Sequence, residues 1–122
     1  MTVEEIVILL VEDDEDDAML ARVRLGRAGV RVPVRHVVRA EEALEEVAAH
    51  PEKQWVVLTD LALPGTDGFE VVRRLAGTHP VYVLTSSLRQ RDRDLALSSG
   101  ARGFFSKPLT ARDLAAIREI HA

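Results

Sequence analysis

The 122-residue sequence contains no cysteine, and its four histidines lack the spacing of metal ligands. The absence of cysteine excludes disulfides, thiolate metal sites and a cysteine nucleophile. No apolar run approaches the roughly 20 residues that a membrane-spanning helix needs. The N-terminus is acidic where a signal peptide would be basic. We therefore expect a cytoplasmic protein without a zinc site and without a membrane segment.

Positive charge is missing from the start of the chain. All eight charged residues up to Asp17 are acids, and six of them are consecutive at residues 12–17. Such a run is ordinarily a solvated surface tract. Here it directly follows residues 6–11, an apolar segment typical of a buried strand, so the first acids stand at the carboxyl end of a strand. The net charge of −4 gives no indication of nucleic-acid binding.

Lysine is scarce, because the chain has 14 arginines and only two lysines. Lys53 lies in a polar stretch, residues 50–54, and is expected in a loop. Lys107 ends an apolar segment just before Pro108. A lone lysine is usually solvated, but this position at the end of a strand makes Lys107 a candidate functional residue.

Short apolar runs alternate with helical patterns, which is typical of repeated βα units and a parallel sheet. The strands are expected near residues 6–11, 34–38, 55–59, 81–85 and 103–106. Right-handed crossovers then give a doubly wound α/β fold, with helices on both faces of a five-stranded sheet. The length of the chain leaves no room for a second folded domain.

Helices are expected between the strands. The first has an apolar face that Gly29 closes, and two more are expected at residues 41–49 and 68–76. That face consists of Ala18, Ala21, Leu25 and Ala28. The helix at residues 88–98 is the weakest, with Leu88, Leu95 and Leu97 to anchor it. The last helix begins at Thr110, which can form a capping box with Asp113. Leu114, Ile117 and Ile120 are expected to face the core.

Polar residues stand where four of these strands end, and ligands of open α/β sheets bind beyond the carboxyl ends of the strands. They are Glu12, Asp13 and Asp14 after the first strand, Asp60 after the third, Thr85, Ser86 and Ser87 at the fourth, and Lys107 after the fifth. Taken singly, an Asp there is usually a turn or a cap, and a Thr reflects β propensity. Their common location at one edge predicts a site.

The chemistry of this set favours phosphoryl transfer. Clustered carboxylates repel one another unless a hard cation neutralises them, and Mg²⁺ takes one or two carboxylates together with phosphate oxygens. An Asp carboxylate is a competent nucleophile for a phosphoryl group. The charge on the transferred oxygens calls for a metal, a cation and neutral donors. Asp60, Mg²⁺, Lys107 and Thr85 supply that set.

Four motifs in order resemble the receiver domain of two-component response regulators. They are LVEDD at residues 10–14, TDLALPGTDG at 59–68, VLTSS at 83–87 and GARGFFSKP at 100–108. The resemblance covers almost the whole chain. It implies a flavodoxin-like (βα)5 fold with strand order 2-1-3-4-5 and a single receiver domain at residues 1–122, without an output domain.

The resemblance also implies a role for each site residue. Asp60 would accept the phosphoryl group, while Asp13 and the carbonyl oxygen of Ala62 would bind Mg²⁺ directly and Glu12 would act through water. Thr85 and Lys107 would bind the phosphoryl group. Phe104 has the position of the switch aromatic but lacks a hydroxyl, so switching there must rely on packing. The Lys107–Pro108 peptide bond is typically cis in this family.

The function implied is that of a stand-alone response regulator. It takes its phosphoryl group from a histidine kinase and is not an enzyme beyond its own phosphorylation and dephosphorylation. Asp14 and Asp17 resemble the small receivers that partner bacteriophytochromes. Output would be a homodimer or kinase contact through the fourth helix, fifth strand and fifth helix, with no nucleic acid or membrane as partner. The fourth helix would contribute Arg89, Arg91, Asp92, Arg93 and Asp94.

The sequence leaves two alternatives open. A phosphatase of the haloacid-dehalogenase type also forms an aspartyl phosphate, but it needs a second Asp two residues after the nucleophile, where this chain has Ala62. A receiver-like binding module that works without phosphorylation would carry the same motifs. Exposure to acetyl phosphate or beryllofluoride with Mg²⁺ separates such a module from an active receiver.

Overall fold

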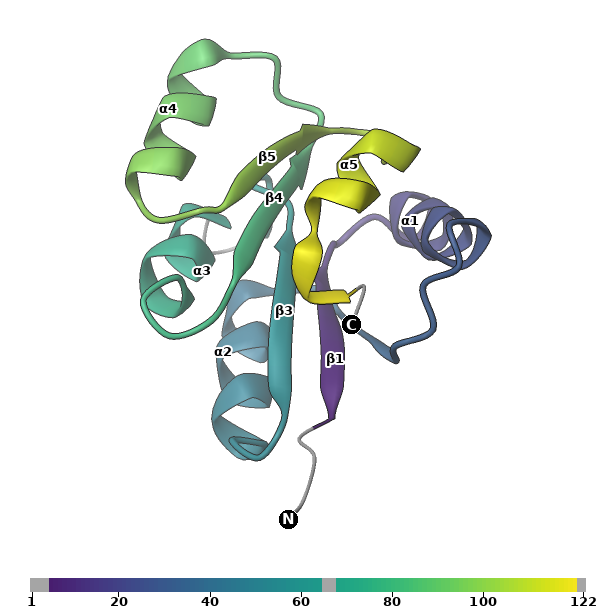
Figure 1. The fold of residues 1–122 in the computed structure, drawn as a ribbon. Coiled ribbons are helices and arrows are strands. Elements are labelled where there is room, and N and C mark those ends of the chain that lie inside the picture. The colour runs from purple at the N-terminus through teal and green to yellow at the C-terminus, as the bar shows by residue number, and fades with distance from the viewer. Residues whose placement is uncertain (1–4, 65–67, 121–122) are drawn as a thin grey trace.

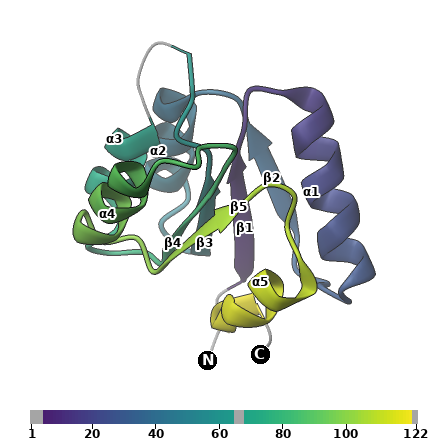
Figure 2. The same ribbon diagram turned by 90° about the horizontal axis from the view of Figure 1, so that it is seen from above.

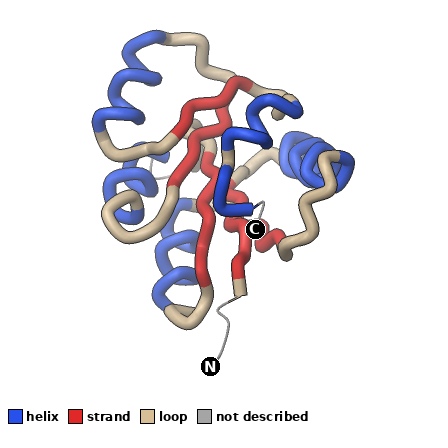
Figure 3. The backbone as a smooth tube through the Cα atoms, viewed as in Figure 1, coloured by secondary structure: helices blue, strands red, loops and turns tan. Residues whose placement is uncertain are grey.

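The computed structural model describes residues 5–64 and 68–120. Within these ranges, five strands form one parallel sheet in the order β2-β1-β3-β4-β5. Figure 1 labels β1, β3, β4 and β5, and Figure 3 draws the strands in red. The strands are β1 (Ile6–Val11), β2 (Val34–Val37), β3 (Gln54–Thr59), β4 (Val81–Thr85) and β5 (Gly103–Ser106). The predicted fold class and strand order are confirmed, and the strand boundaries agree to within one residue.

Five helices connect and follow the strands. They are α1 (Glu15–Arg27), α2 (Ala40–Ala49), α3 (Gly68–Leu75), α4 (Gln90–Ser98) and α5 (Ala111–Ala116), and a 3₁₀ turn, η1 (Arg118–Ile120), follows α5. Figure 2 shows α2, α3 and α4 on one side of the sheet and α1 on the other. None of the helices in the described ranges is long and apolar enough to cross a membrane.

The sheet has a core on each face because successive side chains of a strand point to opposite sides. In β1, Leu9 belongs to the cluster that packs under α2, α3 and α4, while Leu10 belongs to the cluster under α1 and α5. The strands β1, β3 and β4 are buried along nearly their whole length. Both faces are covered, which is the usual condition of a parallel sheet.

The buried residues of helix α1 are those predicted for its apolar face, except at the end of the helix. Ala18, Ala21 and Leu25 are buried, but Ala28 is exposed, so the prediction for Ala28 is wrong. Ala28 is the C-cap residue, where the chain leaves the helical path and no longer presents that face to the sheet. Gly29 follows with φ of +83°, a left-handed conformation that favours glycine at the end of a helix.

Helix α4 is held to the sheet differently from the prediction. Leu88, Leu95 and Leu97 are all exposed, Leu88 to 90%. Within α4, all of which the structure describes, Ala96 is the one buried residue. A small alanine lets the helix backbone approach the sheet and turns the larger leucines outward. The anchoring is therefore thinner than three leucines would provide.

The C-terminal segment confirms the predicted capping box. The Thr110 hydroxyl accepts a hydrogen bond from the Asp113 N–H at 3.1 Å, and the Asp113 carboxylate accepts one from the Thr110 N–H at 3.0 Å. The α-helix ends at Ala116, earlier than its apolar pattern suggests, yet Ile117 and Ile120 are both buried. Their spacing of three residues matches a 3₁₀ turn, so η1 replaces the last turn of α-helix.

Candidate functional site

The backbone fixes the site residues at the carboxyl edge of the sheet. The N–H of Glu12 donates to the carbonyl oxygen of Val37 at 3.0 Å, and that of Asp60 donates to Val11 at 3.0 Å. The N–H of Lys107 donates to Thr85 at 2.9 Å. Each acceptor is the last residue of the neighbouring strand. The backbone hydrogen bonds between neighbouring strands thus continue one residue beyond the strand ends. They bring the predicted residues together at the carboxyl edge of the sheet.

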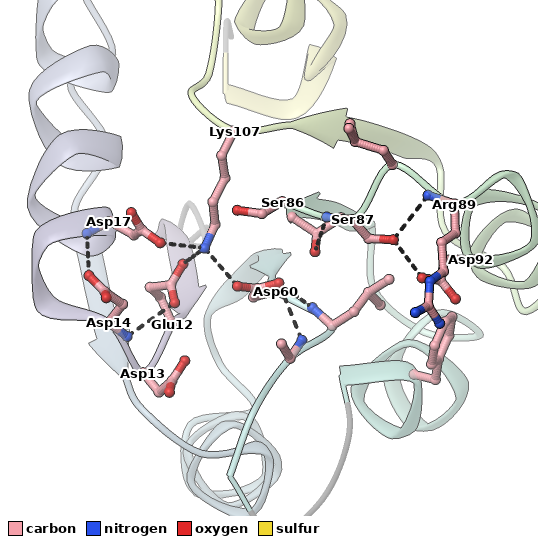
Figure 4. Close-up of a pocket in the computed structure, with 15 residues that line it drawn as sticks. Glu12, Asp13, Asp14, Asp17, Asp60, Ser86, Ser87, Arg89, Asp92 and Lys107 are labelled. Atoms are coloured by element: carbon pink, nitrogen blue, oxygen red, sulfur yellow. Dashed lines mark hydrogen bonds and ion pairs between the residues drawn. The ribbon is translucent and has the colours of Figure 1, made fainter.

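Lys107 joins three acidic residues of this edge into one network (Figure 4). Its ammonium donates to Oδ2 of Asp60 at 2.7 Å and to Oδ2 of Asp17 at 2.8 Å, and it forms an ion pair with Glu12. The Lys107 side chain is 13% exposed, and those of Glu12 and Asp60 are still more buried. The Lys107–Pro108 peptide bond is cis, as the family resemblance implies.

The other oxygen of Asp60 is held by the backbone. Oδ1 accepts from the N–H of Leu61 at 2.7 Å and from that of Ala62 at 3.3 Å. Gly68 packs directly against this turn, because a Cβ there would lie 1.9 Å from the Asp60 carbonyl oxygen. The Asp60 side chain is therefore fixed at both oxygens, by Lys107 and by the turn. Residues 65–67 of the same motif lie outside the described residues.

Burial and pairing shift two of the titrating groups. Burial raises the pKa of Glu12, although the hydrogen bonds from Lys107 and from the N–H of Asp14 act in the opposite direction. Burial alone lowers the pKa of Lys107, but hydrogen bonds to its three carboxylate partners outweigh burial and raise it above its ordinary value. Lys107 is therefore a permanent positive charge beside Asp60 at neutral pH.

Three carboxylates form a cluster suited to a cation. One oxygen each of Glu12, Asp13 and Asp60 lies within 4.8 Å of the others. Asp13 is exposed, whereas Glu12 and Asp60 are buried. A hard oxygen-ligand set with one side open to water fits Mg²⁺, which keeps several waters. Glu12, Asp13 and Asp60 thus form one group of carboxylates able to face a cation, and exposed Ala62 lines the same cleft.

The cleft above these residues has a volume of about 610 Å³, and its far wall comes from the end of β4 and from α4. The Thr85 hydroxyl oxygen accepts from the N–H of Ser87 at 3.3 Å. The Ser87 hydroxyl donates to Oδ2 of Asp92 at 2.5 Å and accepts from the N–H of Arg89 at 3.3 Å. A chain of hydrogen bonds therefore leads from the buried Thr85 to the first turn of α4.

The sequence did not predict two contacts of the site. Asp17 bonds Lys107, and its position three residues after the N-cap Asp14 is a signal that could have placed it on the inner side of α1. His36 Nε2 lies 2.7 Å from the carbonyl oxygen of Glu12. No local pattern marks that histidine. Phe104 is half-buried and packs against the core under α2, α3 and α4.

The fold and site define an open α/β domain with an acidic cleft beyond its strand ends. The family model of the response regulator receiver domain matches residues 8–119, and the chain belongs to this family. It is 34% identical over 113 residues to the two-component response regulator ORR41 of Oryza sativa, covering 90% of this chain and 89% of that protein. Receiver domains bind Mg²⁺ through acidic residues and have histidine kinases as partners.

Solved structures agree with this assignment. The BeF3-activated N-terminal receiver domain of Klebsiella pneumoniae RstA superposes with a TM-score of 0.79 at 32% identity, over 93% of this chain and 97% of that one. The bacteriophytochrome response regulator AtBRR gives 0.79 at 30% identity, over 97% and 94%. The chain spans about half the length of several transcriptional regulators that it also matches.

Proposed function

We propose that Asp60 accepts a phosphoryl group from a histidine kinase in a Mg²⁺-dependent step. The observation that carries the proposal is the state of the Asp60 side chain, which is buried, bonded by Lys107 at one oxygen and by backbone N–H groups at the other. A nucleophile held in this way is already oriented for attack. The ammonium beside it stabilises the negative charge of the phosphoryl oxygens.

In the transfer, an Asp60 carboxylate oxygen attacks the phosphorus of the kinase phosphohistidine. The phosphorus–nitrogen bond breaks, and the imidazole departs with a proton from solvent. Asp13, Asp60 and the Ala62 carbonyl oxygen would hold Mg²⁺ directly and Glu12 would act through water, and the ion would supply positive charge beside the transferred oxygens. Lys107 and the Thr85 hydroxyl bind the remaining oxygens. Water later hydrolyses the acyl phosphate, and the exposed Ser86 partly restricts its access.

The phosphorylated site acts on α4 through Thr85. When the Thr85 hydroxyl turns to donate to a phosphoryl oxygen, the loop that carries Ser87 shifts with it, and the Ser87–Asp92 bond passes that shift to α4. The helix responds readily because Ala96 is its buried anchor. On β5, Phe104 rotates into the space behind Thr85, and packing alone determines its position.

The output is a change in protein association through α4, β5 and α5, in the form of a homodimer or a kinase contact. This face carries exposed leucines at positions 95 and 97 and alternating charges at residues 91–94. Charges of both signs on one helix can pair across a two-fold axis. Similarity to the bacteriophytochrome response regulator AtBRR supports a bacteriophytochrome as the kinase.

Acetyl phosphate with Mg²⁺ tests the acceptor directly. The mass of the intact protein should increase by one phosphoryl group, and Asp60→Asn should show no increase. Asp16→Asn, which removes a carboxylate from the exposed side of α1, should still be phosphorylated. An adduct on Asp60→Asn would identify another nucleophile. If the unmodified chain takes no phosphoryl group, it is a binding module that works without phosphorylation.

A further inference from the structure

Lys107 uses its full donor capacity in the network described above. A lysine ammonium has three N–H donors. Among the described residues, three carboxylates accept from it or pair with it: Glu12, Asp60 and Asp17. The first two also belong to the cluster that fits a divalent cation, and Asp17 does not. Asp17 is thus the one of these three carboxylates that pairs with Lys107 without also belonging to the cation cluster.

The N-terminus of α1 aims Asp17 at the cleft. The side chain of Asp14, the N-cap residue, accepts a hydrogen bond from the Asp17 N–H at 2.9 Å, which fixes the first turn of the helix. Side chains of a helix lean toward its N-terminus. The carboxylate of Asp17 therefore points back toward the strand ends, where it meets Lys107 at 2.8 Å (Figure 4).

Cation binding draws carboxylate charge away from Lys107, and phosphorylation moves the negative charge of Asp60 outward to the phosphoryl oxygens. Glu12 and Asp60 are engaged by the cation, and Lys107 must shift from the Asp60 carboxylate to the phosphoryl oxygens once the acyl phosphate forms. An ammonium whose partners are withdrawn is free to swing into solvent, because its stem has four rotatable methylenes. Asp17 stands outside the cation cluster and is not consumed by the reaction, so its bond to Lys107 can persist.

We infer that Asp17 is a positioning residue of the phosphoryl site, which holds the Lys107 ammonium over Asp60 while Glu12 and Asp60 are engaged by the cation and the phosphoryl group. The inference rests on the proposed function. Asp17 acts through Lys107 and does not touch the transferred group. Its removal should weaken the loaded site more than the metal-free one, in which Glu12 and Asp60 still hold the lysine.

A structural role for Asp17 makes a different prediction. Any acid in the first turn of a helix stabilises it through the helix dipole. Asp16 is the adjacent acid in the same turn, its side chain is exposed, and within the described residues Lys107 has no bond to it. Asp16→Asn therefore removes the same charge from the same turn and serves as the matched control for Asp17→Asn.

NMR of protein carrying Nζ-labelled lysine reads the position of Lys107 directly. The chain has only two lysines, so Lys53 supplies an internal reference. A buried, bonded ammonium exchanges slowly and gives a sharp signal. The Lys107 signal should be sharp in metal-free Asp17→Asn and should broaden or vanish when Mg²⁺ is added. In the unmodified chain and in Asp16→Asn it should remain sharp in both conditions.

Fluorine NMR of beryllofluoride in the presence of Mg²⁺ measures how tightly the site binds this mimic of the phosphoryl group. Exchange of the Asp17 carboxylate for a neutral amide weakens its hydrogen bond from Lys107, which should weaken beryllofluoride binding on the order of tenfold in Asp17→Asn. Asp17→Glu, which keeps the carboxylate, should recover part of that loss, and Asp16→Asn should bind as the unmodified chain does. A purely structural role would give no such recovery and no Mg²⁺-dependent change at Lys107.

The outcomes separate the two proposals. If the unmodified chain binds beryllofluoride and Asp17→Asn behaves as Asp16→Asn in both experiments, the positioning role is wrong and the proposed function stands. If Asp17→Asn retains a sharp Lys107 signal with Mg²⁺, Lys107 does not depend on Asp17. If the unmodified chain binds neither Mg²⁺ nor beryllofluoride, the proposed function fails, and the positioning role fails with it.

Discussion

The Lys107 ammonium donates a hydrogen bond to the Asp60 carboxylate at 2.7 Å and so joins the ends of β5 and β3, two strands separated in the sheet by β4. Both side chains are largely buried. The bond places a positive charge against the proposed phosphoryl acceptor before any phosphoryl group arrives. It also offsets the repulsion between Asp60 and the neighbouring acid Glu12.

Replacing Lys107 with methionine should destabilise the fold. Breaking a buried pair leaves uncompensated charge, and we expect the free energy of unfolding to fall by about 3 kcal/mol. Mg²⁺ should restore part of it, since the cation neutralises the same carboxylates. Urea unfolding with and without Mg²⁺ measures both effects. The control is Lys53→Met, because the Lys53 ammonium lies 5.7 Å from the Trp55 ring centre and outside the site. Equal effects of the two variants on the free energy of unfolding would contradict the expectation.

Replacing Asp13 with asparagine should weaken Mg²⁺ binding by at least about tenfold, because it removes a charged ligand from the cluster. Asp13 is exposed, so the fold should keep its stability. Calorimetric titration with Mg²⁺ gives the affinity. Asp16→Asn removes an equal charge nearby, outside the cluster, and should change the affinity little. Unchanged affinity in Asp13→Asn would remove Asp13 from the metal site.

Replacing Gly68 with alanine should disturb both the fold and the acceptor. The added Cβ would lie 1.9 Å from the Asp60 carbonyl oxygen and 2.6 Å from the Cα of Leu61. Relief of that overlap must move backbone, and we expect a loss of about 3 kcal/mol in the free energy of unfolding, together with weaker phosphorylation by acetyl phosphate. Gly77→Ala is the control, because its Cβ meets nothing within 4 Å.

Stability at high pH should depend on Tyr82. Burial, and next the hydrogen bond that it donates to Glu119 at 2.5 Å, raise the pKa of Tyr82 to about 12 from 10.0. The folded state therefore favours the protonated phenol. The resulting stabilisation is fully present below pH 10 and is lost as the pH rises through 12.

The test of this pH dependence uses the fact that Tyr82 is the one tyrosine in the sequence. Tyrosinate absorbance follows its ionisation in the folded protein, and urea unfolding across the same pH range gives the stability. Tyr82→Phe should lose that part of the alkaline dependence. A Tyr82 pKa near 10 in the folded protein would mean that in solution the phenol is neither buried nor bonded to Glu119 as the structure shows.

Charge reversal of Arg91 and Arg93 to glutamate should weaken association of the phosphorylated protein. Both arginines are exposed on α4 and alternate with acids, so reversal replaces attraction across a two-fold interface with repulsion. Phosphorylation of Asp60 should be unaffected, as intact mass can confirm. Sedimentation with and without beryllofluoride measures association, and identical behaviour of the variant and the unmodified chain would place the interface elsewhere.

Much of the fold could be predicted because the sequence patterns that indicate its helices and strands are local. The apolar runs of β1 and β3, the capping box of Thr110 and Asp113, and the glycine after α1 each depend on residues a few positions apart. The leucines of α4 show where this reasoning fails. Periodicity identified apolar residues on a helix, but which side meets the sheet depends on how closely the backbone approaches, and Ala96 permitted an approach that left the leucines exposed.

The sequence by itself determined which residues stand at the strand ends, and a parallel sheet brings all its carboxyl ends to one edge. The strand order followed from the resemblance of its motifs to the receiver family. Only the tertiary structure decided which of those residues touch. Asp17 and Lys107 are 90 residues apart, and Tyr82 and Glu119 are 37 apart. Such pairs depend on the orientation of α1 and η1 against the sheet. That orientation is set by packing over the whole core, which no short stretch of sequence contains.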